Sequence, residues 1–167
     1  MRVRLPSTLT AIGASAFSSC TSLASIVIPD AVTSIGAYCF YNCLSLHDVT
    51  LSQRLTELPD YTFHWCWNLD SFTVPASVTR LGRNLVTSVY HQGVTKGPRE
   101  IYFLGNAPAY DADTYSGALS SLTTYIKYNS RGWDGRASSR DIPEAWPTTL
   151  ATCALSTVPS PGWSSSQ

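Results

Sequence analysis

One feature constrains the fold of this chain more than any other: an apolar pattern that repeats every 23 residues. The same period aligns several independent columns, which are Leu5, Ile28, Leu51 and Val74; Phe17, Phe40 and Phe63; Cys20, Cys43 and Cys66; and Leu23, Leu46 and Leu69. A single unit of this length cannot bury its apolar side, whereas stacked units bury one continuous core. The repeat therefore predicts a solenoid of stacked coils.

One unit shows how each coil is expected to run. Ile26 and Ile28 alternate with polar residues and predict a short strand that faces inward. Val32 and Ile35 return to the core along a second extended stretch. Residues 37–42 follow a glycine and are interpreted as one short helical turn. Neighbouring coils then place equivalent strands side by side as a parallel sheet.

The pattern L-x-x-I-x-I-P-x-x-V-T-x-I-G-x-x-A-F-x-x-C-x-x resembles the BspA-like leucine-rich repeat family over residues 5 to about 85. The resemblance implies an α/β fold: a right-handed leucine-rich-repeat solenoid of short parallel strands and short helical turns, with an irregular C-terminal cap. It also implies a binding or adhesion module, not an enzyme, from a bacterial protein that is secreted or lies at the cell surface.

The regularity ends after the fourth coil, which divides the chain into three expected parts. Residues 1–85 form about four coils, residues 86–147 form an irregular last coil and cap, and residues 148–167 form a flexible tail rich in Ser, Thr and Pro. Residues 89–98 are interpreted as an inserted loop, and Ile101–Leu104 as the delayed next strand.

The cap itself resembles the irregular last coil of the same family. In the segment IYFLGNAPAYDADTYSGALSSLTTYIKYNSRGW, Tyr125–Tyr128 is the expected last strand. Trp133 and Trp146 are expected to cover the apolar end of the stack.

We expect neither a cap nor a signal peptide at the N-terminal end of this sequence. Leu5, Leu9, Ile12 and Phe17 belong to the first coil and are expected to lie on an uncovered end. An exposed sheet end favours association. We therefore expect either a fragment of a longer solenoid or end-to-end pairing with a second copy.

Composition excludes several classes of partner. Eleven basic and eleven acidic residues give a net charge of zero, and charged residues are only 13% of the chain. This balance does not favour nucleic acid. Because no run of about 18 apolar residues occurs, no membrane insertion is expected. No motif for a cofactor or metal is present, so none is expected.

The cysteines are interpreted as structural. Cys20, Cys43 and Cys66 form a straight column of buried reduced thiols, which does not converge on a metal ion. A disulfide between neighbours is conceivable but would distort the stack. Cys39 is expected to face partly outward, and Cys153 lies in the tail.

The outward positions of the strands make the first candidate binding surface. They are Ser25, Asp48 and Ser71 in one row and Val27, Thr50 and Thr73 in the next, flanked by His47 and Asp70. His47 and Asp70 could touch, either as half of a catalytic pair or as a surface hydrogen bond, and the hydrogen bond is favoured. No nucleophile is fixed beside them.

An aromatic cluster on the turn side makes the second candidate surface. Its members are Tyr38, Tyr41, Tyr61, His64, Trp65 and Trp67. Exposed aromatic side chains suit protein or glycan contact. Stacking between coils is the competing interpretation of the same residues.

The sequence therefore predicts non-enzymatic binding of a protein or glycan through the strand face or through Trp65 and Trp67. Two alternatives stay open. One is a structural spacer within a longer stalk. The other is an enzyme in the cap that uses His91 or the carboxylates of Asp111 and Asp113, although solvated loop carboxylates are the favoured interpretation of that pair.

Overall fold

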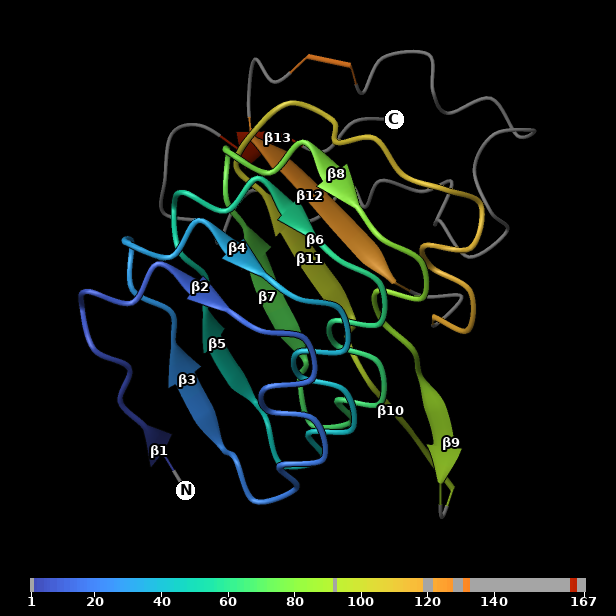
Figure 1. The fold of residues 1–167 in the computed structure, drawn as a ribbon. Helices are drawn as coiled ribbons and strands as arrows, with labels where there is room; N and C mark the ends of the chain where they lie inside the picture. The colour runs from blue at the N-terminus through green and yellow to red at the C-terminus, as the bar shows by residue number, and fades with distance from the viewer. Residues whose placement is uncertain (1, 92, 119–121, 128–130, 133–162, 165–167) are drawn as a thin grey trace.

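The computed structural model describes residues 2–91, 93–118, 122–127, 131–132 and 163–164. The chain winds as a parallel-strand β-solenoid of about five turns (Figure 1). Within the described residues the strands are β1 (Arg2–Val3), β2 (Ala11–Ile12), β3 (Ser25–Val27), β4 (Ser34–Ile35), β5 (Asp48–Thr50), β6 (Glu57–Leu58), β7 (Ser71–Val74), β8 (Arg80–Leu81), β9 (Val89–His91), β10 (Val94–Lys96), β11 (Glu100–Phe103), β12 (Thr123–Lys127) and β13 (Trp163–Ser164).

The first strand of each coil builds one face of the solenoid. Strands β1, β3 and β5 pair in parallel, and so do β7, β11 and β12, with β7 beside β5. Ser25 pairs with Asp48 and Val27 with Thr50, so residues 23 apart stand side by side. The register predicted from the repeat is confirmed on these strands.

The second strand of each coil builds a facing layer (Figure 1). Strand β2 pairs with β4, and β6 pairs with β8, all in parallel. These strands are short, and each buries its second residue, as Ile35 and Leu58 show, while Ser34 stays exposed. The core therefore lies between the two layers.

Stacked columns of apolar side chains fill that core. The rings of Phe17, Phe40 and Phe63 lie nearly parallel, with centroids 5.5 and 5.6 Å apart between neighbours. Phe40 and Phe63 are fully buried. Full burial of such a side chain contributes about 1.5–3 kcal/mol, and each coil gains this only when another coil covers it.

The predicted helical turns are wrong: no helix occurs among the described residues. On the turn side of the coils, backbone hydrogen bonds run from one coil to the next. The N–H of Phe17 donates to the carbonyl of Cys39 at 2.9 Å, and that of Phe40 donates to the carbonyl of Thr62 at 3.1 Å. Tyr38 and Asn42 have φ near +60°, which a right-handed helix excludes. The turn is thus a ladder of coil-to-coil bonds.

The same backbone corrects the expectation for Cys39. Its side chain is fully buried, although it was expected to face partly outward. Tyr38 reverses the chain with its positive φ of 60°, so Cys39 and Phe40 both turn toward the core. A helical turn would have placed two successive side chains about 100° apart.

The repeat breaks at residues 89–98, as predicted, but the expected loop contains two strands. Strands β9 and β10 form an antiparallel hairpin that projects from the coils (Figure 1). Strand β11 then resumes the first face, which confirms the delayed strand predicted for Ile101–Leu104.

The last coil differs in part from the prediction. Strand β12 begins at Thr123, earlier than the expected Tyr125. Tyr128, Trp133 and Trp146 lie outside the described residues. Within the stretch expected to be a tail, β13 pairs antiparallel with β12.

Candidate functional site

The strand face is the first of the two surfaces that the sequence predicted. Asp48, Thr50, Ser71 and Thr73 are exposed on β5 and β7, and Val27 is 60% exposed on β3. The intervening residues point into the core. Because the strands are hydrogen-bonded and packed on that core, these side chains stand on a rigid frame.

Ser25 does not share that exposure. Its side chain is only 9% exposed, although its position in the first row is as predicted. Ser25 therefore offers little surface for contact with a large partner. The accessible part of the face begins at Val27 and Asp48.

Strands β11 and β12 extend the face with a group that the sequence argument missed. The rings of Tyr102 and Tyr125 stack with centroids 4.7 Å apart. The Tyr102 hydroxyl donates to Oε2 of Glu100 at 2.6 Å, and the Tyr125 hydroxyl donates to Oε1 at 3.5 Å. The Glu100 carboxylate thus accepts a hydrogen bond from each of the two phenol groups.

A sequence signal for this group exists. Tyr102 and Tyr125 are 23 residues apart, and Tyr102 pairs with Thr73 across the sheet. The inserted hairpin shifts β11 away from the 23-residue register of β7, which hid the alignment. Counting the repeat afresh after the insertion places both tyrosines in the row of Thr50 and Thr73.

The possible pair of His47 and Asp70 is not formed in the part of the chain that the structure describes, either as half of a catalytic pair or as the surface hydrogen bond that the sequence favoured. Both residues are exposed. Among the ion pairs and hydrogen bonds of the described residues, none joins their side chains. The backbone of Asp70 instead takes part in the hydrogen bonding of the sheet: its carbonyl accepts hydrogen bonds from the N–H groups of Arg99 and Glu100 at 2.7 and 3.2 Å.

A second surface gathers aromatic rings on the turns of two coils. We call it the turn-side patch, and its members are Tyr38, Tyr41, Tyr61, His64 and Trp65. Tyr38 stacks on Tyr61 with centroids 4.6 Å apart, and Tyr41 stacks on His64 at 5.6 Å. The stacking between coils that was one interpretation of these residues is therefore observed.

Stacking does not bury the whole patch. Tyr38 remains 39% exposed and Trp65 40% exposed. Trp65 leans against both Tyr41 and His64, at 5.2 and 5.3 Å between centroids. Trp67, the other predicted contact residue, is half-buried and follows the buried Cys66.

His64 is the histidine of the turn-side patch. Burial lowers the pKa of its imidazole, and a hydrogen bond with the backbone of Asn84 opposes this shift in part. Its Nδ1 is buried without a hydrogen-bond partner in the described part of the chain. The neutral ring is therefore favoured at neutral pH.

The cap offers no assembled catalytic group among the residues described. Asp111 and Asp113 are exposed, and the Asp111 carboxylate lies 3.7 Å from Nε of Arg83. The side chain of His91 lies outside what the structure describes. No cluster of three metal-ligating side chains occurs in the described residues.

The cysteine column packs as predicted at Cys43 and Cys66, but the expected burial of Cys20 is wrong. Cys43 and Cys66 are buried, and their Sγ–H groups donate to the carbonyls of Phe17 and Phe40, both at 3.1 Å. Burial, more than neighbouring thiols, raises the pKa of Cys43 to about 11 and that of Cys66 well above its ordinary value. Cys20 is exposed, and Cys153 lies outside the described residues.

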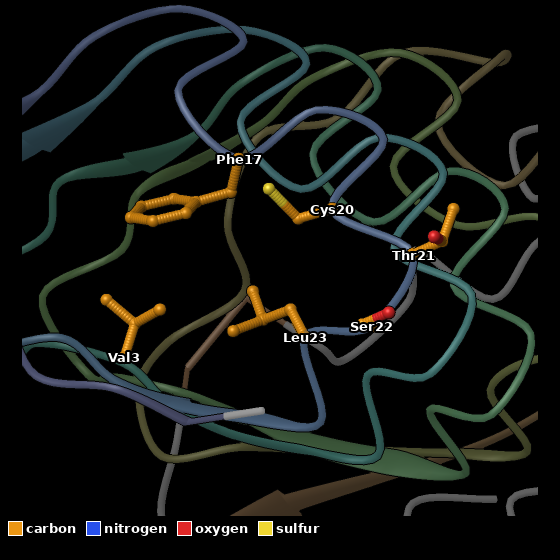
Figure 2. A pocket seen from close by; sticks show the side chains of 6 residues that line it. All are labelled: Val3, Phe17, Cys20, Thr21, Ser22 and Leu23. Carbon is orange, nitrogen blue, oxygen red and sulfur yellow. The ribbon is translucent and has the colours of Figure 1, made fainter.

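The exposure of Cys20 belongs to a cavity in the first coil. The cavity measures about 190 Å³, and its lining residues are Val3, Phe17, Cys20, Thr21, Ser22 and Leu23 (Figure 2). Phe17 and Leu23 belong to columns that are fully covered in later coils. The cavity is thus the end of the core, left open on its first coil.

A stack of parallel coils with one polar strand face and a core of repeated apolar columns defines a leucine-rich-repeat solenoid. The BspA type leucine-rich repeat region matches residues 1–102 in six copies. The chain belongs to this family, which confirms the resemblance seen in the repeat. No protein among the curated proteins matches it.

Solved structures agree with this assignment. A leucine-rich cell surface protein from Faecalibacterium prausnitzii is 28% identical with a TM-score of 0.63, over 78% of this chain and 32% of that chain. Leucine-rich repeat proteins from Bacteroides ovatus and T. pallidum are both 23% identical, with TM-scores of 0.60 and 0.61. These cover 75% of this chain, and 33% and 57% of their own.

The chain thus spans much less than the full length of these relatives. The two that are 23% identical support the fold alone. In the described residues no helix is long and apolar enough to cross a membrane.

Proposed function

We propose that this chain is a non-enzymatic binding module that contacts a protein or glycan partner through the strand face. The observation that carries the proposal is the row-by-row exposure of Asp48, Thr50, Ser71 and Thr73 on two hydrogen-bonded sheets, which meet where β5 lies beside β7. Short polar side chains on a rigid frame contact a partner with little loss of conformational entropy.

The relatives support a role outside the cytoplasm. One similar structure is that of a leucine-rich cell surface protein, and solenoids of this kind use extended faces for partners. We therefore assign the module to a secreted or surface-exposed bacterial protein. Steering by charge is a small part of binding, since the chain carries no net charge.

The geometry favours binding over catalysis. Catalysis requires a nucleophile or acid–base group held near a partner that activates it. In the described residues no hydrogen bond joins the side chains of His47 and Asp70, and the carboxylate of Asp111 is paired with Arg83. The strand face instead offers hydroxyl and carboxylate groups that accept and donate hydrogen bonds without any of them being activated.

The test is a solid-phase binding assay on a panel of immobilised matrix proteins and polysaccharides. The triple variant Asp48→Ala, Thr50→Ala, Thr73→Ala is expected to fold normally, since all three side chains are exposed, and to lose binding to whichever panel member the native chain binds. Equal binding by the native chain and a folded triple variant would exclude the strand face.

A structural spacer is the second candidate, and the continuous stack of Phe17, Phe40 and Phe63 favours it. Strand β1 pairs on one side only, and the cavity at Phe17 exposes the end of the core. A coil that stacks on this end would continue both the sheet and the phenylalanine column. In this role the chain makes its contacts with neighbouring coils. The strand-face triple variant is then expected to leave those contacts unchanged.

A further inference from the structure

Three aromatic residues of the turn-side patch have a backbone conformation that aromatic residues rarely adopt. Tyr38, Tyr61 and Trp65 have φ values of 60°, 58° and 63°, in the left-handed region where a bulky residue is an outlier. Equivalent positions on other coils hold serine or asparagine. The coil therefore does not need an aromatic ring there, and strain of this kind is concentrated at functional sites.

The strained backbone is held firmly in place. The N–H of Tyr38 donates to the carbonyl of Asp60 at 3.0 Å, and that of Tyr61 donates to Arg83 at 2.9 Å. The Tyr61 hydroxyl also accepts a bond from the amide of Asn84 at 3.3 Å. The rings are therefore pre-organised, which lowers the entropic cost of binding a ligand.

The repeat column of Trp65 holds polar, uncharged residues in the two preceding coils. Asn42 and Ser19 precede Trp65 in this column, and the Asn42 amide donates to the Ser19 hydroxyl at 3.3 Å. Ser19 is exposed and Asn42 is half-buried. No carboxylate, ammonium or guanidinium group is a member of the turn-side patch, so a charged ligand finds no counter-charge within it.

We propose that the turn-side patch is a binding site for neutral carbohydrate, separate from the strand face. A pyranose ring has one face of C–H groups whose slightly positive hydrogens are attracted to the electron-rich face of an aromatic ring. Trp65 and Tyr41 supply this surface. The Asn42 amide and Ser19 hydroxyl supply hydrogen bonds for the hydroxyl groups at the sugar's edge.

The experiment is affinity electrophoresis of the full chain in native gels that contain dextran, mannan or laminarin, with heparin as the charged comparison. The native chain is expected to be retarded by at least one neutral polysaccharide. The variant Trp65→Asn removes the ring but suits the positive φ of 63°, because asparagine tolerates that region. Its affinity is expected to fall at least tenfold while its melting temperature stays equal or rises.

Two further variants make the result specific. Val94→Asn removes another exposed apolar side chain, 52% exposed on the hairpin, and is expected to leave the retardation unchanged. The strand-face triple variant Asp48→Ala, Thr50→Ala, Thr73→Ala is also expected to be retarded like the native chain. The experiments therefore distinguish an error in the strand-face proposal from an error in the proposal for the turn-side patch.

Several outcomes would overturn the proposal. They are no retardation by any of the three neutral polysaccharides, retardation by heparin alone, and equal retardation of native chain and folded Trp65→Asn. Binding of a panel protein that depends on Trp65, with no retardation by polysaccharide, would assign the patch to a protein partner and also contradict it.

Discussion

At the scale of single residues, one glycine position shows how closely the coils approach. A Cβ on Gly36 would meet backbone atoms of Ala14 in the preceding coil, whereas a Cβ on Gly13, at the same repeat position of the first coil, meets nothing within 4 Å. The requirement for glycine thus comes from stacking and not from the turn alone.

This difference gives a matched pair of variants. Gly36→Ala is expected to lower the free energy of unfolding by about 1–3 kcal/mol, because the added methyl group forces two coils apart. Gly13→Ala is expected to be neutral or to stabilise by about 0.4–1 kcal/mol. Urea denaturation checks both, and equal effects of the two substitutions would contradict the contact between coils.

Thiol reactivity tests the cysteine column. In a Cys153→Ser background we expect Cys20 to react quickly at pH 8 with an aromatic disulfide reagent, because it is exposed. Cys39 and Cys43 are expected to react only on unfolding, since burial raises their pKa values to about 12 and about 11 and leaves little thiolate. Rapid reaction of more than one thiol would refute this account.

The same shifts predict how stability depends on pH. The thiols of Cys39 and Cys43 have folded pKa values raised from the ordinary 9.0. The unfolded chain therefore releases these protons first as pH rises, and their stabilising contribution, complete below pH 9, is lost toward pH 12. The urea midpoint is expected to fall between pH 8.5 and pH 10.5, and less in a variant that replaces both cysteines with alanine.

At the scale of the element, the turn is the part of the coil that the sequence did not predict. Apolar spacing and the proline-bounded strands identified the two strands correctly, because their pattern follows from inside–outside alternation. The turn depends instead on where its N–H groups are satisfied. Tyr38 and Trp65 are not residue types that favour the left-handed conformation, and the signal for it lies in the asparagines that their repeat columns hold in other coils, Asn84 and Asn42.

The candidate sites were also predicted in part from the sequence and missed in part. Asp48 and Thr73 were predicted as exposed, because strand alternation and a fixed period place them. The Tyr102–Glu100–Tyr125 group was missed because an insertion, which turned out to be the hairpin of β9 and β10, interrupts the count. Exposure of Trp65 was predicted, but the strain that distinguishes its position was visible only in the backbone.

Asp60 tests the bonds that join successive turns. Its Oδ1 accepts the N–H of Arg83 at 2.8 Å, as Asp30 accepts that of Gln53 at 2.9 Å. Asp60→Ala is expected to cost about 1 kcal/mol because the bond between coils is lost. Asp60→Asn keeps an acceptor oxygen and is expected to cost less than half of this in thermal or urea unfolding. Equal losses would show that the carboxylate's charge, and not the bond, is what matters.

At the scale of the whole molecule, the open first coil predicts association. Leu5, Leu9 and Phe17 are only half-buried there, beside the open cavity. The apparent mass of this chain in multi-angle light scattering is expected to rise with concentration, and Leu5→Lys with Leu9→Lys is expected to suppress the rise. A constant monomer mass at high concentration would count against end-to-end pairing.

The central claim is that the strand face, and not another surface, meets the partner. Carbodiimide labelling of carboxylates, read by mass spectrometry with and without the panel member that binds, tests it within one sample. Asp48 and Asp70 lie on or beside the strand face, whereas Asp30 and Asp113 are exposed elsewhere. The account predicts that the partner protects Asp48 and Asp70 while Asp30 and Asp113 label as before; protection of Asp30 or Asp113 with Asp48 and Asp70 still labelled would contradict it.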